Sequence, residues 1–175
     1  IKEVPDDIFN LTKNKDYVLE RPVFKNLKQF ILIHLKNYLD KIVSAKDVEL
    51  YITQSWFTVT RHGMSHRVHK HANSYLSGTF YMYDVKPEDK VIFHKKHYDL
   101  NDILLPERTS FNLYNSETWF LPAAPGKLML FPSDISHHVS PMEGTHVRTS
   151  LAFNTFLRGR LGYQTALSEL YLKYQ

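Results

Sequence analysis

The sequence predicts a mainly β protein, a sandwich or barrel with flanking helices, and three observations predict it. One segment near the N-terminus has the apolar spacing of a helix. The segments after Asp47 are short and rich in β-branched and aromatic residues, and Pro, Gly, Asn and Asp separate them. A chain of 175 residues is the size of one domain with a substantial core. We expect a helical N-terminal support at about residues 1–45 and a barrel at about residues 48–157.

The expected helix covers residues 22–43, PVFKNLKQFILIHLKNYLDKIV. Pro22 suits its first turn, where the missing backbone N–H costs nothing. Apolar residues recur at steps of three and four, as on one face of an α-helix. They are Phe24, Leu27, Ile31, Leu35, Tyr38 and Ile42. We expect this face to pack against the core.

The strand candidates follow one another with turn residues between them. They are VELYITQSWFTVT (48–60), YLSGTFYMYDV (75–85), KVIFH (90–94), KLMLF (127–131) and THVRTSLAFNTF (145–156). Residues 99–118 have little periodicity, which is typical of a functional cover loop, and we expect them to lie over the mouth of a site. The tail YQTALSELYLKY, residues 163–174, fits either a short helix or a closing strand.

Composition narrows the possible sites and partners. The chain has no cysteine, so any bound metal must use nitrogen or oxygen ligands. The net charge of +4 and the pI near 9.1 are compatible with nucleic-acid binding, but the lysines are scattered and favour a solvated surface. The longest apolar run, FILI, is far too short to span a membrane, and we expect a cytoplasmic protein. No phosphate-binding glycine loop, G-x-S-x-G or H-E-x-x-H motif occurs.

Four histidines fall within HGMSHRVHKH, residues 62–71. Side chains alternate in an extended segment, so His69 and His71 project to the same side. Such a pair forms half of a metal site, although two exposed or hydrogen-bonded histidines would have the same spacing. We interpret His66 as exposed or one layer behind the site, and His62 as a surface residue.

Residues 126–154 predict a second part of the same site. If residues 141–144 form a four-residue hairpin loop, His137 pairs with Arg148. Directly opposed residues share a face, which would be a polar cavity lining, while His138 points the other way. The residues expected on this face are His137, Arg148, Ser150, Ala152 and Asn154. The opposite face, with residues such as Leu151 and Phe153, would pack on the core.

The buried guanidinium of Arg148 requires an anionic partner, because an unpaired buried charge is too costly. Two partners are open. One is an internal Asp or Glu, and the other is the carboxylate of a ligand held by the planar guanidinium fork with help from the Ser150 hydroxyl.

Three motifs in this order resemble a known family. They are G-x5-H-x-H-x2-S-x-L-S-G-x2-Y from Gly63 to Tyr81, G-x-L-x2-F-P-S-x3-H from Gly126 to His137, and R-x-S at Arg148. Together they resemble the 2-oxoglutarate- and iron(II)-dependent oxygenases of bacteria and their phages, over about residues 56–153. The resemblance implies a double-stranded β-helix, which is a jelly-roll or cupin-like barrel, in the cytoplasm of a bacterial or phage-infected host cell.

The same resemblance implies roles for individual residues. It implies that His69 and His137 bind iron(II), that Arg148 and Ser150 bind the distal carboxylate of 2-oxoglutarate, and that Tyr81 supports this carboxylate. The broader superfamily uses two histidines and one carboxylate, whereas this chain has a histidine at the carboxylate position. The third iron ligand is therefore His71 by the family pattern, with Asp134 and water as alternatives.

The implied activity is that of a dioxygenase that consumes dioxygen and 2-oxoglutarate and hydroxylates a substrate that the sequence does not identify. A cupin-like metal-dependent isomerase or hydrolase is an alternative that would have no need of Arg148 and Ser150. A non-catalytic β-barrel binding module is another, and it would bind no iron. We interpret Trp56 as core packing, and His94 and His97 as parts of a solvated turn. The sequence leaves the oligomeric state open.

Overall fold

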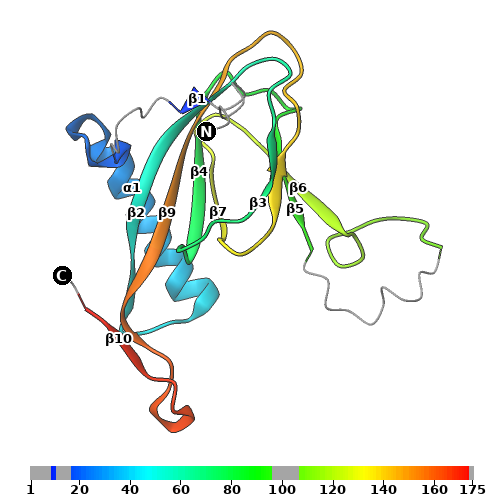
Figure 1. Ribbon diagram of the computed structural model, residues 1–175. Coiled ribbons are helices and arrows are strands. Elements are labelled where there is room, and N and C mark those ends of the chain that lie inside the picture. Colours follow the sequence, from blue (N-terminus) through cyan, green and yellow to red (C-terminus); the bar gives the residue numbers. More distant parts are fainter. Residues whose placement is uncertain (1–8, 11–16, 96–106, 174–175) are drawn as a thin grey trace, which may run out of the picture.

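The computed structural model describes residues 9–10, 17–95 and 107–173, and its main feature is a pair of antiparallel β-sheets (Figure 1). The larger sheet has the strand order β1-β2-β9-β4-β7, with β10 added to β9, and the smaller sheet has the order β3-β8-β5-β6. The strands are β1 (Phe9–Asn10), β2 (Val48–Thr60), β3 (His66–His69), β4 (Leu76–Tyr83), β5 (Lys90–His94), β6 (Thr118–Pro122), β7 (Leu128–Pro132), β8 (His137–Val139), β9 (Arg148–Leu161) and β10 (Leu170–Leu172).

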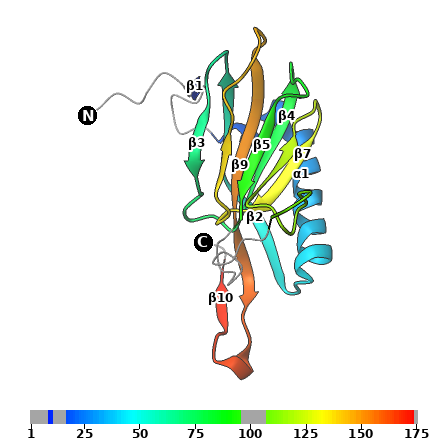
Figure 2. The ribbon, with the colours of Figure 1, turned by 90° about the vertical axis from the view of Figure 1, so that its right-hand side faces the viewer.

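The two sheets lie face to face, and helix α1 (Lys25–Tyr38) covers the outer face of the larger one (Figure 2). The prediction of a mainly β protein with a flanking helix is confirmed. The sheets do not close into a barrel, because the described strands of one sheet form no ladder with those of the other. No helix in the described part of the chain is long and apolar enough to cross a membrane.

The helix predicted over residues 22–43 is confirmed as three consecutive pieces. A 3-10 turn (Pro22–Phe24) leads into α1, and a π-helical turn (Leu39–Val43) follows it. Ile31 and Leu35 are buried against the sheet, as expected. Ile42 was expected on the same face but is 69% exposed. The π turn explains this, because its wider winding rotates the residues that follow away from the apolar face.

Strand β9 separates the core from the space between the sheets. Leu151 and Phe153 are fully buried in the cluster that includes the apolar face of α1. The alternate residues Arg148, Ser150 and Ala152 line a cavity on the opposite face. The predicted alternation along this strand is therefore confirmed, and it turns one face of β9 to the core and the other to the candidate site.

The predicted hairpin between residues 135–140 and 145–150 is wrong. β8 pairs with β3 and β5 in the smaller sheet, and β9 pairs with β2 and β4 in the larger sheet. His137 is opposite His69, while Arg148 is opposite Thr60. The segment between β8 and β9 crosses from one sheet to the other instead of closing a turn. His137 and Arg148 nevertheless line the same cavity, because the inner faces of the two sheets look onto one space.

Two remaining sequence expectations have mixed outcomes. The stretch expected to form a cover loop falls partly on residues 96–106, which lie outside the described residues, and its end runs directly into β6. The C-terminal tail, for which helix and strand were both open, contains a 3-10 turn (Gln164–Ala166) and then β10. β10 pairs with the end of β9, so the tail contains both a short helical turn and a strand.

A glycine in β4 allows the core to close. Gly78 is directly opposite Phe153 in the ladder between β4 and β9. A Cβ atom at Gly78 would lie 2.8 Å from Cε1 of the Phe153 ring and still closer to Cζ, so this ring occupies the space that a side chain would need. Phe153 is fully buried and has no room to move aside.

We expect the substitution Gly78→Ala to lower the free energy of unfolding by about 1–3 kcal/mol, because it overpacks a filled core. Urea denaturation monitored by circular dichroism measures this change. Phe153→Leu supplies the matched control, since a smaller side chain makes room for the added methyl group. The double variant should lose less stability than the sum of the two single losses, and additive losses would contradict the proposed clash.

Candidate metal centre

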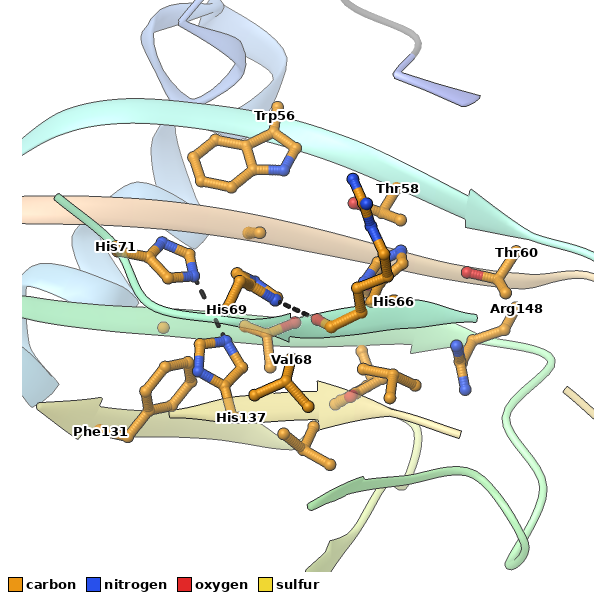
Figure 3. Close-up of a pocket in the computed structure, with 18 residues that line it drawn as sticks. Trp56, Thr58, Thr60, His66, Val68, His69, His71, Phe131, His137 and Arg148 are labelled. Atoms are coloured by element: carbon orange, nitrogen blue, oxygen red, sulfur yellow. Dashed lines mark hydrogen bonds between the residues drawn. The ribbon is translucent and has the colours of Figure 1, made fainter. Parts of the chain in front are cut away.

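A cavity of about 410 Å³ lies between the inner faces of the two sheets (Figure 3). Strands from both sheets supply its walls, with apolar side chains at several points and histidine, threonine and arginine side chains among them. Concave, largely apolar sites with a few convergent polar groups are the usual form of ligand-binding sites. The polar groups of this cavity fall into two sets, one of histidines and one around Arg148.

Three histidines converge at one side of the cavity. His69 ends β3 and is opposite His137, the first residue of β8, while His71 follows two residues after His69. One ring nitrogen of each lies within 4.8 Å of those of the other two. Within the described ranges this is the only group of three or more histidine or acidic side chains with such spacing. The sequence prediction that His69 and His71 project to the same side agrees with this geometry.

One hydrogen-bond acceptor holds each imidazole through its Nδ1 atom. Two of these acceptors are backbone carbonyl groups, and the third is a side-chain amide. The Nδ1 atoms lie 2.7 Å from the Arg67 carbonyl oxygen for His69, 2.6 Å from Asn154 Oδ1 for His71, and 3.0 Å from the Ile135 carbonyl oxygen for His137. Each partner is an acceptor, so each Nδ1 carries the proton and each Nε2 presents a lone pair. The Nε2 atoms of His71 and His137 are 3.3 Å apart, which brings two lone pairs together unless a cation lies between them.

The local environment favours the neutral form of two of these imidazoles, those of His137 and His71. The pKa of His137 is lowered to about 4, mainly by burial and also by the neighbouring histidines, against the opposing effect of the hydrogen bond to Ile135. Burial also lowers the pKa of His71. A neutral imidazole is the form that binds a metal, so His71 and His137 are in the required state at neutral pH.

A hydroxyl network supports the amide that holds His71. Asn154 Oδ1 also accepts a hydrogen bond of 2.9 Å from the Ser77 hydroxyl. Ser77 lies 2.8 Å from Ser133, whose hydroxyl lies 2.7 Å from that of Ser74. The serines belong to the S-x-L-S-G and F-P-S motifs, but their role could not be read from the sequence. It depends on β4, β7 and β9 being neighbours in one sheet.

Trp56 was interpreted as core packing, and this interpretation is wrong. Its ring lines the cavity and stacks near His71, with ring centroids 6.2 Å apart and an interplanar angle of 24°. Trp56 lies on β2 at the position opposite Ala152 of β9, on the cavity face of both strands. The small side chain of Ala152 leaves the space beside the indole open.

Arg148 forms the second polar set and already has an internal partner. Arg148 is 3% exposed, and its Nη1 donates a hydrogen bond of 2.6 Å to Oδ1 of Asp89. His146 Nε2 donates to the other carboxylate oxygen over 2.9 Å, and the Lys86 backbone N–H donates to it over 3.0 Å. Of the two partners that the sequence left open, the internal acid is present, and Arg148 also borders the cavity.

Asp89 could not be identified from the sequence, because it lies 59 residues before Arg148 in a turn without a motif. Burial by itself would raise the pKa of Asp89. The hydrogen bonds from Lys86 and His146 and the positive charge of Arg148 outweigh burial and lower this pKa below its ordinary value of 3.8. The carboxylate is therefore ionised at neutral pH and offsets the charge of Arg148.

Tyr81 and Ser150 lie in the part of the cavity wall near Arg148. They are opposite each other in the ladder between β4 and β9, and both line the cavity. Burial raises the pKa of Tyr81 to about 12, so its hydroxyl remains protonated and able to donate a hydrogen bond. The structure thus places the predicted residues Tyr81, Arg148 and Ser150 in the same cavity as the three histidines.

The other candidate residues lie elsewhere or have different surroundings from those expected. Asp134 is outside the histidine group and borders a separate cavity that also contains His94. His138 points away from the site as predicted, with its Nδ1 2.8 Å from His94 Nε2. His94 therefore belongs to β5 and a histidine pair and not to a solvated turn, while His97 lies outside the described residues. His62 is exposed, as predicted.

Comparison with known proteins identifies the family. Residues 54–154, more than half of the chain, match a family model described as "Putative 2OG-Fe(II) oxygenase". The chain belongs to this oxygenase family. A search of curated proteins finds no match to the sequence. The family implies iron(II) and 2-oxoglutarate as cofactor and cosubstrate.

Solved structures support the fold. An oxidoreductase of the 2OG-Fe(II) oxygenase family from Burkholderia pseudomallei has a TM-score of 0.57 and 11% identity, over 77% of this chain and 57% of that one. The non-heme alpha-ketoglutarate-dependent carbocyclase SnoK from nogalamycin biosynthesis has a TM-score of 0.53 and 14% identity, over 85% of this chain and 65% of that one. The likeness confirms the double-stranded β-helix. The chain spans less than two thirds of the length of either relative.

The three histidines fit the iron(II) that the family implies. Imidazole nitrogen is a suitable ligand for iron(II), and three protein ligands leave coordination positions free for a cosubstrate. The family pattern implies that His71 stands where the broader superfamily has a carboxylate, and its Nε2 points toward that of His137 (Figure 3). With these three residues as ligands, the donor set would be three imidazole nitrogens.

We expect Asn154→Ala to weaken iron(II) binding about 10- to 100-fold, because His71 loses the acceptor that fixes its orientation. Anaerobic competition titration with a chromophoric chelator measures the affinity. His137→Ala should abolish tight binding, and His138→Ala, a change of the neighbouring histidine that points away from the cavity, is the matched control. Unchanged affinity in Asn154→Ala would contradict the role of this amide.

The buried pair of Asp89 and Arg148 predicts a pH-dependent contribution to stability. Asp89 has a lowered pKa in the folded state, so its contribution is complete above the ordinary pKa near 4 and is lost as the pH falls through the lower folded value. Asp89→Asn should therefore lower the free energy of unfolding by about 3 kcal/mol at pH 7. The difference from the parent protein should shrink below about pH 4.

Urea denaturation at a series of pH values measures this difference. Glu49→Gln is the matched control, because Glu49 pairs with Arg158 on the surface and exposed pairs contribute about 0–1 kcal/mol. A difference for Asp89→Asn that stays constant down to pH 3 would show that the carboxylate charge is not the cause.

Proposed function

We propose that this protein is an iron(II)- and 2-oxoglutarate-dependent dioxygenase that hydroxylates a C–H bond of an unidentified substrate. The observation that carries the proposal is the convergence of three imidazoles whose Nε2 lone pairs face one another in the cavity that Arg148 also borders. His69, His71 and His137 are the proposed metal ligands. Membership of the family supports the choice of iron(II) over other metals that bind imidazole.

Bound iron(II) and 2-oxoglutarate supply the activation of dioxygen, with release of succinate and carbon dioxide and transfer of one oxygen atom to the substrate. The chain positions the reactants. The three Nδ1 hydrogen bonds hold the imidazoles in one tautomer and one orientation, so little reorganisation is needed when the metal binds. Trp56 and Phe131 form apolar walls beside His71 and exclude water from the reacting atoms.

We assign binding of the distal carboxylate of 2-oxoglutarate to Arg148 and the residues near it. Arg148 provides a guanidinium that Asp89 holds in one orientation, and Ser150 provides a hydroxyl on the next cavity-facing position of β9. Neighbouring cavity-facing positions of one strand are about 7 Å apart, so Arg148 and Ser150 can act on the same bound group. Tyr81, which remains protonated, is a third donor.

Electrostatics favour a dianionic cosubstrate at this site. Three neutral imidazoles leave the full charge of a divalent ion uncompensated, whereas a carboxylate ligand would remove one unit of it. Among the described residues that line the cavity there is no acidic side chain, and the only anion near Arg148 is Asp89. One carboxylate of 2-oxoglutarate would therefore meet the uncompensated charge of the metal, and the other would meet the guanidinium donors of Arg148, whose charge Asp89 offsets.

The remaining expectations concern partners and location. The scattered lysines argue against nucleic acid as the principal partner, so we infer a substrate that is not nucleic acid. A requirement for 2-oxoglutarate and reduced iron is met in the cytoplasm, and we infer a bacterial or phage-infected cell from the family resemblance.

The test is an anaerobic titration of the protein with iron(II) and 2-oxoglutarate. We expect a weak visible charge-transfer band that is absent with either component alone, and in air we expect succinate formation that requires iron. Both should be lost in His137→Ala. A protein that binds iron but yields neither band nor succinate would contradict the oxygenase proposal and favour a metal-dependent isomerase or hydrolase.

Substitution of the arginine tests the diacid site separately. Arg148→Lys keeps the positive charge but loses the planar fork, so we expect the dissociation constant for 2-oxoglutarate to rise at least about tenfold. Arg158→Lys is the matched control on the same strand, because Arg158 pairs with Glu49 on the surface. Anaerobic titration of the visible band gives both dissociation constants, and equal values would exclude Arg148 from the diacid site.

A further inference from the structure

His66 is the side chain whose surroundings are least explained by the site described so far. Its Nε2 is the one buried side-chain nitrogen or oxygen, in the described part of the chain, that has no hydrogen-bond partner. His66 also lines the cavity. A buried polar atom without a partner is costly, and in native proteins such an atom often marks the place of a bound ligand or water.

The strand pairing explains why His66 faces inward. β3 pairs with β8 through His66 opposite Val139 and His69 opposite His137, with an irregularity between these pairs. In a regular strand, residues three apart project to opposite faces. The irregularity adds one residue on β3, so both histidines face the cavity.

His66 lies between the two polar sets of the cavity. In Figure 3 its ring is between His69 on one side and Arg148 on the other, beside Thr58. The pKa of His66 is lowered to about 4, mainly by burial and also by the positive charge of Arg148. Arg148 is therefore close enough to act on His66 electrostatically, and the His66 ring is neutral at pH 7.

Because Arg148 is paired with Asp89, a ligand carboxylate bound at Arg148 would be stabilised by a further hydrogen-bond donor. The carboxylate of Asp89 already compensates the guanidinium charge and takes one of its N–H groups. A ligand carboxylate at Arg148 would meet less positive charge than at an unpaired arginine. A carboxylate oxygen can accept more than one hydrogen bond, so a further N–H from the cavity wall would stabilise it.

We propose that His66 is a cosubstrate-binding residue whose Nε2–H donates a hydrogen bond to the distal carboxylate of 2-oxoglutarate beside Arg148. This inference rests on the function proposed above. Its consequence is selectivity, because a 2-oxo acid without the distal carboxylate leaves Nε2 of His66 without a partner. The site then prefers a five-carbon diacid to a monoacid of the same length.

The experiment compares two ligands that differ only at the distal end. Anaerobic calorimetry with the iron(II)-loaded protein gives dissociation constants for 2-oxoglutarate and for 2-oxopentanoate, which has a methyl group in place of the distal carboxylate. In His66→Leu we expect binding of 2-oxoglutarate to weaken about 10- to 100-fold, the range for a hydrogen bond to a charged group. Binding of 2-oxopentanoate and of iron(II) should stay within about twofold, because the lost bond concerns neither.

Two further variants separate binding from structure. His66→Gln retains an amide N–H near the position of Nε2 and should recover part of the affinity for 2-oxoglutarate. His62→Leu removes an exposed histidine four residues earlier and should leave both dissociation constants unchanged. The thermal midpoint of metal-free His66→Leu should equal or exceed that of the parent protein, because the variant removes an unpaired buried polar atom.

The outcomes distinguish this inference from the function on which it rests. If the parent protein binds 2-oxoglutarate and His66→Leu binds it equally well, the inference alone is wrong. Equal weakening for both ligands would place His66 at the metal end, and weaker iron(II) binding would make it a metal ligand; either result overturns the inference. A parent protein that binds neither ligand would refute the proposed function together with the inference.

Discussion

The two-residue alternation along β9 is the constraint on which the rest of this structure depends. One face of the strand carries Leu151 and Phe153 into the core beneath α1, and the other carries Arg148, Ser150 and Asn154 toward the cavity. A shift of register by one residue would exchange these faces and place a guanidinium in the core. Burial of the apolar face therefore holds the polar face in position, and stability and site geometry have the same origin.

The three histidines of the site have their orientation set before a ligand arrives. Backbone carbonyls hold His69 and His137, and the amide of Asn154 holds His71. Because each bond uses Nδ1, all three Nε2 atoms are left as acceptors, and burial keeps the pKa values of His71 and His137 low. The same low-polarity surroundings make an ion pair necessary for Arg148, which Asp89 provides. Hydrogen bonding and burial thus prepare the three histidines for a cation and the residues around Arg148 for an anion.

Much of the site could be read from the sequence because its residues follow local rules. The i, i+2 spacing of His69 and His71 places both on one side of an extended chain, and the alternation in β9 placed Arg148 and Ser150 together. His137 and Arg148 line one cavity, as predicted, although they do not pair with each other as the predicted hairpin required. A turn-like segment between two strands does not reveal whether the chain reverses within one sheet or crosses to the facing sheet.

The sequence alone determined the helix, most strands, the inward face of β9 and the common side of His69 and His71, since each depends on periodicity within a few neighbouring residues. Only the tertiary structure decided that Asp89 compensates Arg148, that Asn154 orients His71, that Trp56 faces the cavity and that Nε2 of His66 is buried without a partner. These contacts join residues far apart in the chain or depend on an irregularity in β3. Neither strand order nor a local irregularity leaves a periodic signal in the sequence, because both are set by how the sheets pack.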